Sequence, residues 1–296
     1  MKELEGVVLG GAVLDPLVSV NNKNIDGALT RFPEIHEFAQ QPPIARPIPF
    51  SGLLTNKLLA ALPGAHFARL LPHLEAVSLS ASYNIYSYGD SPTFAYFPET
   101  AVITHLYVLE DGSTTAAALI GNEGMIGLSA IFAATPQSYA TQITIGGSAL
   151  RIDIETLRQE FAHGDALHRV LLKYATARLA QLSQKAVCNG RHHLDERLCT
   201  WLLMVHDRAG QNSLALTHEQ IAHQLGARRA GITDACNALR RAGVIQYRRG
   251  VIRIFNRTLL EKAACECYGT FRHTNQANGI NPRKNGGGIK AVGSAG

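Results

Sequence analysis

The sequence contains no uninterrupted apolar run of the roughly 18 residues that a membrane-spanning helix needs, and acids interrupt its first apolar residues. A signal peptide would need an unbroken apolar core, so we expect a soluble, cytoplasmic protein. The five cysteines are an odd number without regular spacing, which argues against a disulfide scaffold. They are Cys188, Cys199, Cys236, Cys265 and Cys267.

What the sequence does contain is a concentrated positive charge. Its 296 residues, 46% of them hydrophobic, are enough for about two domains with tails. The net charge of +5 and the pI near 9.0 fit a polyanionic partner. The stretch from Gly226 to Arg257 alone holds eight arginines and one acid, Asp234, a local charge of +7. We therefore expect one small element to carry the contact with that partner.

The residues around this charge show where two helices begin and end. Thr217 and Gln220 have the spacing of a helix N-cap and its capping partner, and Gly226 fits the left-handed turn that ends a helix. A second helix is predicted from about Arg228 to Arg241, because apolar residues recur there at i, i+3, i+4 and i+7. Gly243 closes it.

A hairpin follows the second helix. Two β-rich runs, Val244 to Tyr247 and Val251 to Phe255, flank the turn Arg248-Arg249-Gly250. Two short helices, a glycine turn and a hairpin make a winged helix-turn-helix, which binds DNA. The alternative is that the Arg-rich hairpin is only a solvated face. Because the capping residues, the turn glycine, the apolar spacing and the charge excess agree, we favour DNA binding.

The position of each side chain indicates its role on DNA. The first residues of a recognition helix meet base edges in the major groove, where a guanidinium can bond O6 and N7 of guanine together. The base-reading candidates are Arg228, Arg229 and Thr233. Residues near the helix ends and in the wing are better placed for phosphates. The phosphate candidates are Thr217, Arg240, Arg241, Arg248 and Arg249.

We divide the chain into five parts. Residues 1–54 are expected to be a disordered or irregular tail, because the Pro-rich run from Gln40 to Phe50 is incompatible with a regular element. Residues 273–296 form a flexible, Gly-rich tail. The parts between them are a β-roll sensor domain (55–165), a dimerisation helix (166–190) and the winged helix-turn-helix (191–272).

The β-roll is predicted from many short β-rich runs separated by turn signals. Two short helices, around Leu58 to Leu62 and Phe67 to Leu74, lead into it. Short antiparallel strands at this spacing imply a barrel or jelly-roll. The predicted strands are Val77 to Leu79, Phe94 to Phe97, Val102 to Leu109, Thr114 to Ile120, Tyr139 to Ile145 and Ala149 to Ile152.

The longest helical pattern runs from about Leu167 to Asn189 and carries a heptad seam suited to packing against a twin helix. The alternative is that this seam lies on the chain's own barrel, since it spans only two to three heptads. The seam residues are Leu172, Ala175, Leu179, Leu182 and Ala186. A further helix, Asp195 to Arg208, opens the DNA-binding part.

A β-roll, a long helix and a C-terminal winged helix, in this order, resemble the Crp/Fnr family of bacterial transcription regulators. The resemblance covers about residues 55–270 and is most specific in the helix-turn-helix, L-T-H-E-Q-I-A-H-Q-L-G-A-R-R-A-G-I-T-D-A-C-N-A-L-R-R-A-G-V-I. It implies an α+β fold: an N-terminal double-stranded β-helix (a jelly-roll like that of cyclic-nucleotide-binding domains), a long dimerisation helix and a C-terminal winged helix-turn-helix.

The resemblance also implies partners. The protein should be a homodimer on an inverted-repeat operator in double-stranded DNA, with recognition helices about 34 Å apart, and should contact RNA polymerase. Arg229 matches the guanine-reading arginine of the family, whereas Ala230 replaces the acid that follows it in many members. The preferred half-site is therefore left open.

The resemblance places a candidate effector pocket at G-N-E-G-M-I-G-L-S-A-I-F, residues 121–132. Leu128 stands where cyclic-nucleotide members have the Glu that holds the ribose, and Gln137-Ser138 stand at the Arg-Ser pair that holds the phosphate. Met125 and Gly127 complete the set of candidates. A phosphate without a cation would be poorly paired, so cyclic AMP is not the expected ligand. No cysteine precedes Cys188, which also excludes the N-terminal iron-sulfur site of the oxygen-sensing members.

No catalytic site is predicted, because no nucleophile, base and pocket can be assembled from the sequence. His105 is the only histidine in the predicted strands, too few for a cupin-like metal site. Cys188, with His192 and His193, could be combined with the Cys265-Glu266-Cys267 run into a metal site. A single C-x-C is weak evidence, however, and Cys188 is expected to end a packed helix. We therefore expect no enzyme activity, no metal and no cofactor.

Two functions from different classes remain. The first is a sequence-specific DNA-binding regulator whose barrel is a sensor or a ligand-free scaffold. The second is a small-molecule, nucleotide-like binding module whose basic wing is incidental. Salt-sensitive binding to a palindromic site would favour the first, and a ligand that raises the melting temperature would favour the second.

Overall fold

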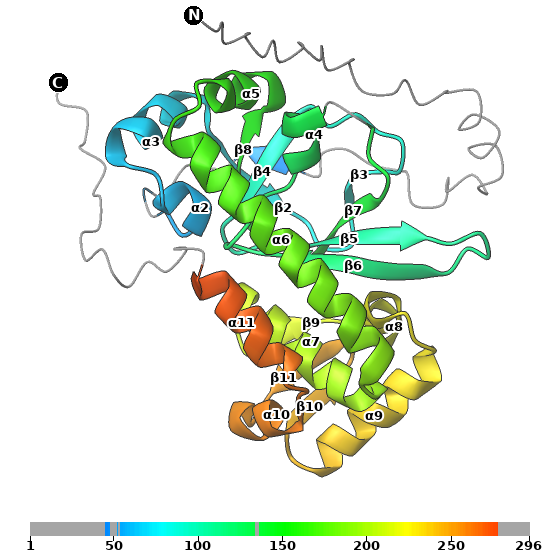
Figure 1. The fold of residues 1–296 in the computed structure, drawn as a ribbon. Helices are drawn as coiled ribbons and strands as arrows, with labels where there is room; N and C mark the ends of the chain where they lie inside the picture. The colour runs from blue at the N-terminus through cyan, green and yellow to red at the C-terminus, as the bar shows by residue number, and fades with distance from the viewer. Residues whose placement is uncertain (1–44, 48–51, 53, 134–135, 278–296) are drawn as a thin grey trace, which may run out of the picture. The chain divides into compact units, whose positions relative to one another are not determined.

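The computed structural model describes residues 45–47, 52, 54–133 and 136–277. They form a β-roll, a long helix and a winged helix-turn-helix in that order (Figure 1). The α+β architecture predicted from the sequence is confirmed, while the domain limits stay predictions. None of the helices in these residues combines the length and the apolar character that crossing a membrane requires.

Two four-stranded antiparallel sheets make the β-roll, in the orders β1-β2-β8-β4 and β3-β7-β5-β6. Buried side chains such as Val77, Ile103 and Ile143 pack together in one cluster from both sheets. The strands are β1 (Ala45–Pro47), β2 (Glu75–Leu79), β3 (Asn84–Tyr86), β4 (Phe94–Pro98), β5 (Val102–Val108), β6 (Thr114–Ile120), β7 (Ala140–Ile145) and β8 (Gly147–Asp153). All six predicted strands are present, and β6 has the predicted bounds.

The N-terminal part corrects one prediction. The Pro-rich run from Gln40 to Phe50 was expected to hold no regular element, yet β1 lies within it and pairs with β2, with Pro47 opposite Val77. β1 is an edge strand, where a missing proline N–H costs no ladder hydrogen bond. The rest of the predicted 1–54 tail lies almost wholly outside the described residues. Of the predicted tail 273–296, residues 273–277 belong to a helix that ends at Ala277, and the others lie outside the described residues.

Short helices surround the β-roll. The two predicted before the strands are present as α2 (Lys57–Ala60) and α3 (Gly64–Leu70), the latter continued by the 3-10 turn η2 (Leu71–His73). α4 (Leu128–Ala133) and α5 (Ile154–Ala162) were not predicted. Asp153 caps α5, since its Oδ1 accepts the N–H of Thr156 at 2.9 Å.

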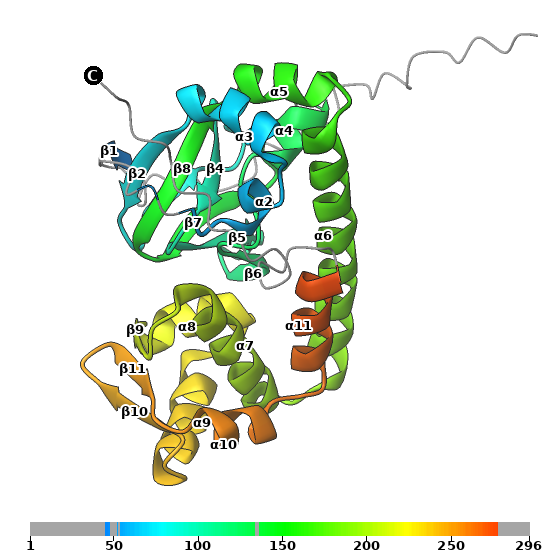
Figure 2. The same cartoon turned by 90° about the vertical axis from the view of Figure 1, so that its left-hand side faces the viewer.

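α6 (Ala166–Arg191) is the long helix, and α7 (Leu194–Ala209) follows it after a two-residue break (Figure 2). Both exceed the predicted ranges by one or two residues at each end, where helix ends are least sharply defined. One face of α6 is buried on the β-roll through residues such as Leu171 and Tyr174. Gly210, at φ +64°, ends α7.

The winged helix follows: β9 (Ser213–Ala215), α8 (His218–Leu225), α9 (Arg229–Arg241), β10 (Ile245–Arg248) and β11 (Val251–Ile254). α10 (Arg257–Ala263) and α11 (Cys267–Ala277) come last. The three strands pair in the order β10-β11-β9. The core of this part contains Trp201, Leu202, Ile221, Ile232 and Ile252.

Candidate nucleic-acid interface

The helix-turn-helix has the predicted local geometry. Thr217 caps α8: its hydroxyl accepts the Gln220 N–H at 3.2 Å, and Gln220 Oε1 accepts the Thr217 N–H at 2.8 Å. Gly226 ends α8 in the left-handed region at φ +57°. Arg228 is the N-cap residue of α9. The helix itself begins at Arg229, one residue after the predicted start. The short turn fixes the start of α9 relative to α8.

Arg228 and Arg229, the two arginines among the base-reading candidates, are exposed at the start of α9. The Arg229 side chain is 71% accessible, and its Nε lies 3.6 Å from Glu219 Oε2. A pair this exposed and this long contributes little to stability. The Arg229 guanidinium is therefore available to a ligand with stronger acceptors.

Thr233 is engaged within the protein. Its hydroxyl donates to the Arg229 carbonyl at 3.0 Å and lies 3.0 Å from His218 Nδ1. The His218 ring in turn stacks on Tyr247 of the wing, with centroids 4.2 Å apart. Burial, and then the charge of Arg229, lowers the pKa of His218. These contacts connect α9, α8 and the wing, so Thr233 would have to give up a contact to read a base.

The wing turns through Arg249 at φ +48° and Gly250 at φ +77°, the pattern of a two-residue type I′ hairpin. Arg248, Arg249 and Arg253 are exposed, while Ile252 and Ile254 of β11 are buried. The Leu216 N–H donates to the Gly250 carbonyl at 2.8 Å. This hydrogen bond holds the wing turn beside Thr217. The phosphate candidates Thr217, Arg248 and Arg249 therefore lie on one surface.

The remaining arginines of the basic stretch divide into two kinds. Arg240 and Arg241 are exposed in the last turn of α9, where a positive charge also interacts favourably with the helix dipole. Arg257, by contrast, pairs with Asp207 at 2.8 Å and with Glu261 at 3.0 Å. It joins α10 to α7, so the sequence count of +7 overstates the charge offered to a partner.

The predicted dimer seam faces away from the chain's own β-roll. Leu172, Leu179 and Leu182 are 45%, 67% and 39% exposed, and Ala186 is exposed as well. Ala175 is half-buried. The alternative, in which this seam packs on the barrel of the same chain, does not agree with these exposures.

Four of the five effector-pocket candidates are buried or half-buried in the β-roll. Met125 is 2% exposed and belongs to the β-roll core, and Leu128 begins α4 and packs against that core. Gly127 is buried at φ +93°, and Ser138 is exposed. Gln137 is buried, and neither side-chain polar atom has a hydrogen-bond partner among the described residues. A cavity of about 50 Å³ lies elsewhere, between α6, α7 and β6.

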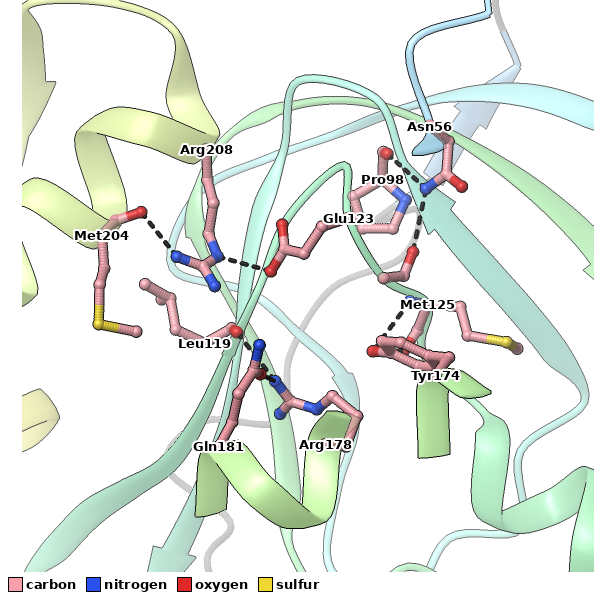
Figure 3. Close-up of polar contacts among 11 residues, drawn as sticks. Asn56, Pro98, Leu119, Glu123, Met125, Tyr174, Arg178, Gln181, Met204 and Arg208 are labelled. Carbon is pink, nitrogen blue, oxygen red and sulfur yellow. Dashed lines mark hydrogen bonds and ion pairs between the residues drawn. The ribbon is translucent and has the colours of Figure 1, made fainter. Parts of the chain in front are cut away.

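The loop after β6 was interpreted from sequence as part of a pocket, but here it receives helix side chains (Figure 3). Arg208 of α7 donates to Glu123 Oε1 at 2.7 Å and to the Met204 carbonyl at 2.9 Å. Both charged side chains are buried. A Cβ on Gly121 would lie 2.7 Å from Arg208 Cβ, so this glycine admits the arginine. In the sequence, this contact could have been inferred from the position of Arg208, a charged residue at helical spacing among the apolar residues of α7.

The same loop is held from α6 and from the start of α2. The Tyr174 hydroxyl accepts the Met125 N–H at 3.1 Å and donates to the Met125 carbonyl at 3.2 Å (Figure 3). Asn56 Nδ2 donates to the Pro98 and Gly124 carbonyls at 2.9 Å each. The loop is thus fixed by three helices.

A second polar contact joins α8 to the β-roll. Gln224 is buried; its Oε1 accepts from Thr104 Oγ1 at 3.1 Å and its Nε2 donates to Thr144 Oγ1 at 3.4 Å. Gln220, the capping partner of Thr217, donates through Nε2 to Ser82 Oγ at 2.9 Å. The first helix of the helix-turn-helix therefore packs directly on the β-roll.

Comparison with known proteins agrees with this geometry. Residues 196–263 match the family model of the Crp-like helix-turn-helix domain. No curated protein sequence matches the chain. Among solved structures, the chain is similar to FixK2 from Bradyrhizobium japonicum, with 21% identity and a TM-score of 0.55 over 65% of this chain and 98% of that one.

Two further solved structures are similar. One is CLP, a c-di-GMP-responsive global regulator of Xanthomonas campestris, at 15% identity and TM-score 0.54, covering 65% of this chain and 99% of that one. The other is TTHB099, a CRP-family transcriptional regulator of Thermus thermophilus, at 16% identity and TM-score 0.53, covering 63% of this chain and 95% of that one. These findings agree with the resemblance seen in the sequence: the chain has the fold of those regulators, and its residues 196–263 are a Crp-like helix-turn-helix domain.

Proposed function

We propose that the protein is a sequence-specific DNA-binding transcription regulator. The observation that carries the proposal is the pair of exposed guanidinium groups of Arg228 and Arg229 at the start of α9. Arg229 reads guanine in the major groove, and the wing arginines and Thr217 bind the flanking phosphates. The structural role of Thr233 in linking α9 to His218 makes it the weakest of the three base-reading candidates.

In this proposal the regulator acts as a homodimer on an inverted repeat. The exposed leucines of α6 supply the apolar surface that a twin helix would cover. Two-fold symmetry would then place two recognition helices in successive major grooves, about 34 Å apart. Contact with RNA polymerase belongs to the same proposal.

The effector of this regulator is not cyclic AMP. Leu128 is packed against the core where a ribose-binding carboxylate would be needed, and no cation stands at Gln137-Ser138. The phosphate of a cyclic nucleotide would lose its hydration without gaining a charged donor. The unpartnered side chain of Gln137 offers neutral hydrogen bonds only.

The test is DNA selection followed by binding measurements at two salt concentrations. We expect a palindromic site and affinity that falls steeply with salt. Arg229→Ala should lower discrimination at one base pair by about 1–3 kcal/mol, whereas Arg249→Ala should weaken all sequences alike. Arg169→Ala, which removes an exposed charge from α6, is the matched control and should change neither. If Arg229→Ala and Arg249→Ala both weakened binding equally for all sequences, the assignment of Arg229 would be contradicted. Binding that is independent of salt and without sequence preference would refute the function.

A further inference from the structure

Four potential metal ligands that are distant in sequence meet at one place. Cys188 lies in the last turn of α6, His192 is the C-cap residue of that helix, Cys265 precedes α11, and Cys267 is its first residue. Their ligand atoms all lie within 4.8 Å of one another. Cys188 Sγ is 3.6 Å from Cys265 Sγ, and Cys267 Sγ is 3.6 Å from His192 Nδ1.

Two of these separations match the edges of a tetrahedron around one ion, and the others are no longer than 4.8 Å. Zinc binds thiolate sulfur at about 2.3 Å and imidazole nitrogen at about 2.0–2.1 Å, so tetrahedral sites have ligand-to-ligand edges of roughly 3.5–3.8 Å. The two 3.6 Å separations fall in that range. An iron-sulfur cluster spreads its ligands around several iron atoms and needs more room than this group offers.

The surroundings of the four ligands favour their metal-binding forms. His192 Nε2 contacts Glu266 Oε2 at 3.1 Å, which holds the proton on Nε2 and leaves the Nδ1 lone pair directed at the cysteines. A carboxylate behind a histidine is a common arrangement in zinc sites. The histidine is thus already oriented as a ligand.

Hydrogen-bond donors also point at the sulfurs. Gln184 Nε2 donates to Cys267 Sγ at 3.0 Å. Thr200 Oγ1 lies 3.0 Å from Cys265 Sγ and accepts the Cys265 N–H at 3.2 Å, so its own hydrogen is free to reach the sulfur. Such donors stabilise thiolates rather than thiols. Phe271 and Met204 shield the group from water.

We propose that Cys188, His192, Cys265 and Cys267 bind one zinc ion in a closed, four-coordinate structural site. Three soft thiolates and one imidazole in tetrahedral geometry select zinc among the common divalent ions. With every position taken by protein, no place is left for a substrate or a water nucleophile. The ion fastens α11 and the segment before it to the end of α6, where the DNA-binding part begins. This replaces the sequence-based expectation of no metal.

The first experiment measures metal content. The full chain is purified under reducing conditions without chelator, and zinc is determined by mass spectrometry before and after reconstitution. We expect about one zinc per chain, and cobalt substitution should give the intense sulfur-to-cobalt charge-transfer absorption of a thiolate site. Cys188→Ala and Cys267→Ala should lose both signals. Cys236→Ala, which removes a buried cysteine of α9 outside the group, is the control and should keep both.

A second variant keeps the test independent of folding. Glu266 is exposed, so Glu266→Gln should leave the circular dichroism spectrum unchanged. Zinc affinity, measured by competition with a chromogenic chelator, should fall by about 10- to 100-fold. The proposal is overturned if the reconstituted protein holds less than about a tenth of an equivalent of zinc, or if Cys267→Ala binds as tightly as the parent. It is equally overturned if peptide mapping of the reduced, zinc-treated protein finds Cys188 and Cys265 joined by a disulfide.

Discussion

The buried ion pair between Arg208 and Glu123 gives the sharpest stability prediction. The two side chains are 5% and 6% exposed, and the Nε to Oε1 distance is 2.7 Å. Replacing Arg208 by methionine preserves most of the volume but leaves a carboxylate buried without its partner. Removing one member of a buried pair costs about 3–5 kcal/mol, because the remaining charge stays desolvated.

Two comparisons isolate the electrostatic part of that cost. The double variant Arg208→Met with Glu123→Gln removes both charges and should recover most of the loss, since uncharged replacements of buried pairs are often neutral. Glu75→Ala is the exposed control: the Glu75 side chain is 57% accessible, and its pair with Arg151 is 2.8 Å long. An exposed pair is worth about 0–1 kcal/mol.

The assay is urea unfolding of the parent, the two single variants Arg208→Met and Glu123→Gln, the double variant and the control. Unfolding is followed by circular dichroism and by fluorescence of Trp201, which lies in α7 with Arg208. We expect Arg208→Met to lower the urea concentration at the unfolding midpoint strongly and the double variant to restore it. The reasoning would be refuted if Arg208→Met lowered the free energy of unfolding by less than about 1 kcal/mol. It would also be refuted if the double variant lost as much free energy of unfolding as the two single variants together.

Three further predictions concern packing, pH and assembly. Gly121→Ala should destabilise by about 1–3 kcal/mol in urea unfolding, because its Cβ would meet Arg208, whereas Gly190→Ala, with open space around it in α6, should be neutral or stabilising. Burial lowers the pKa of His105 to about 3, so between pH 6.5 and 3 the unfolded chain binds a proton that the native chain does not. The free energy of unfolding should therefore fall as the pH falls through that window. His105→Phe should make the free energy of unfolding, measured at several pH values, depend less on pH. Leu179→Glu should convert dimers to monomers in light scattering, and Lys173→Glu, on another face of α6, should not; a monomeric parent protein would contradict the seam.

Local signals in the sequence determined the parts that were predicted well. The start and end of α8 depend on Thr217, Gln220 and Gly226, whose interactions span only a few residues. The wing turn depends on Arg249 and Gly250 in the same way. Such elements can be located from sequence because the atoms that fix them are neighbours in the chain.

Elements held by distant contacts were missed. β3 and β9 have three residues each, too few for a periodic pattern, and exist because they pair with β7 and β11. α11 is seated on α6 through Cys267 and Phe271, which join Cys188 in one buried cluster. The cysteine group was set aside in the sequence because a single C-x-C is weak evidence; the fold is what brings its four potential ligand atoms within 4.8 Å of one another.

The glycine-rich loop after β6 has contacts that the sequence did not indicate. From the resemblance, residues 121–132 were interpreted as a candidate effector pocket, and that interpretation stays a prediction. In this chain the space above Gly121 and Gly124 is taken by Arg208 and Tyr174, side chains from α7 and α6. A residue larger than glycine at either position would have to displace a helix side chain rather than a ligand. Any change in the conformation of this loop must therefore break or move contacts to α6, which links the β-roll to the winged helix, and to α7, which belongs to the winged-helix core.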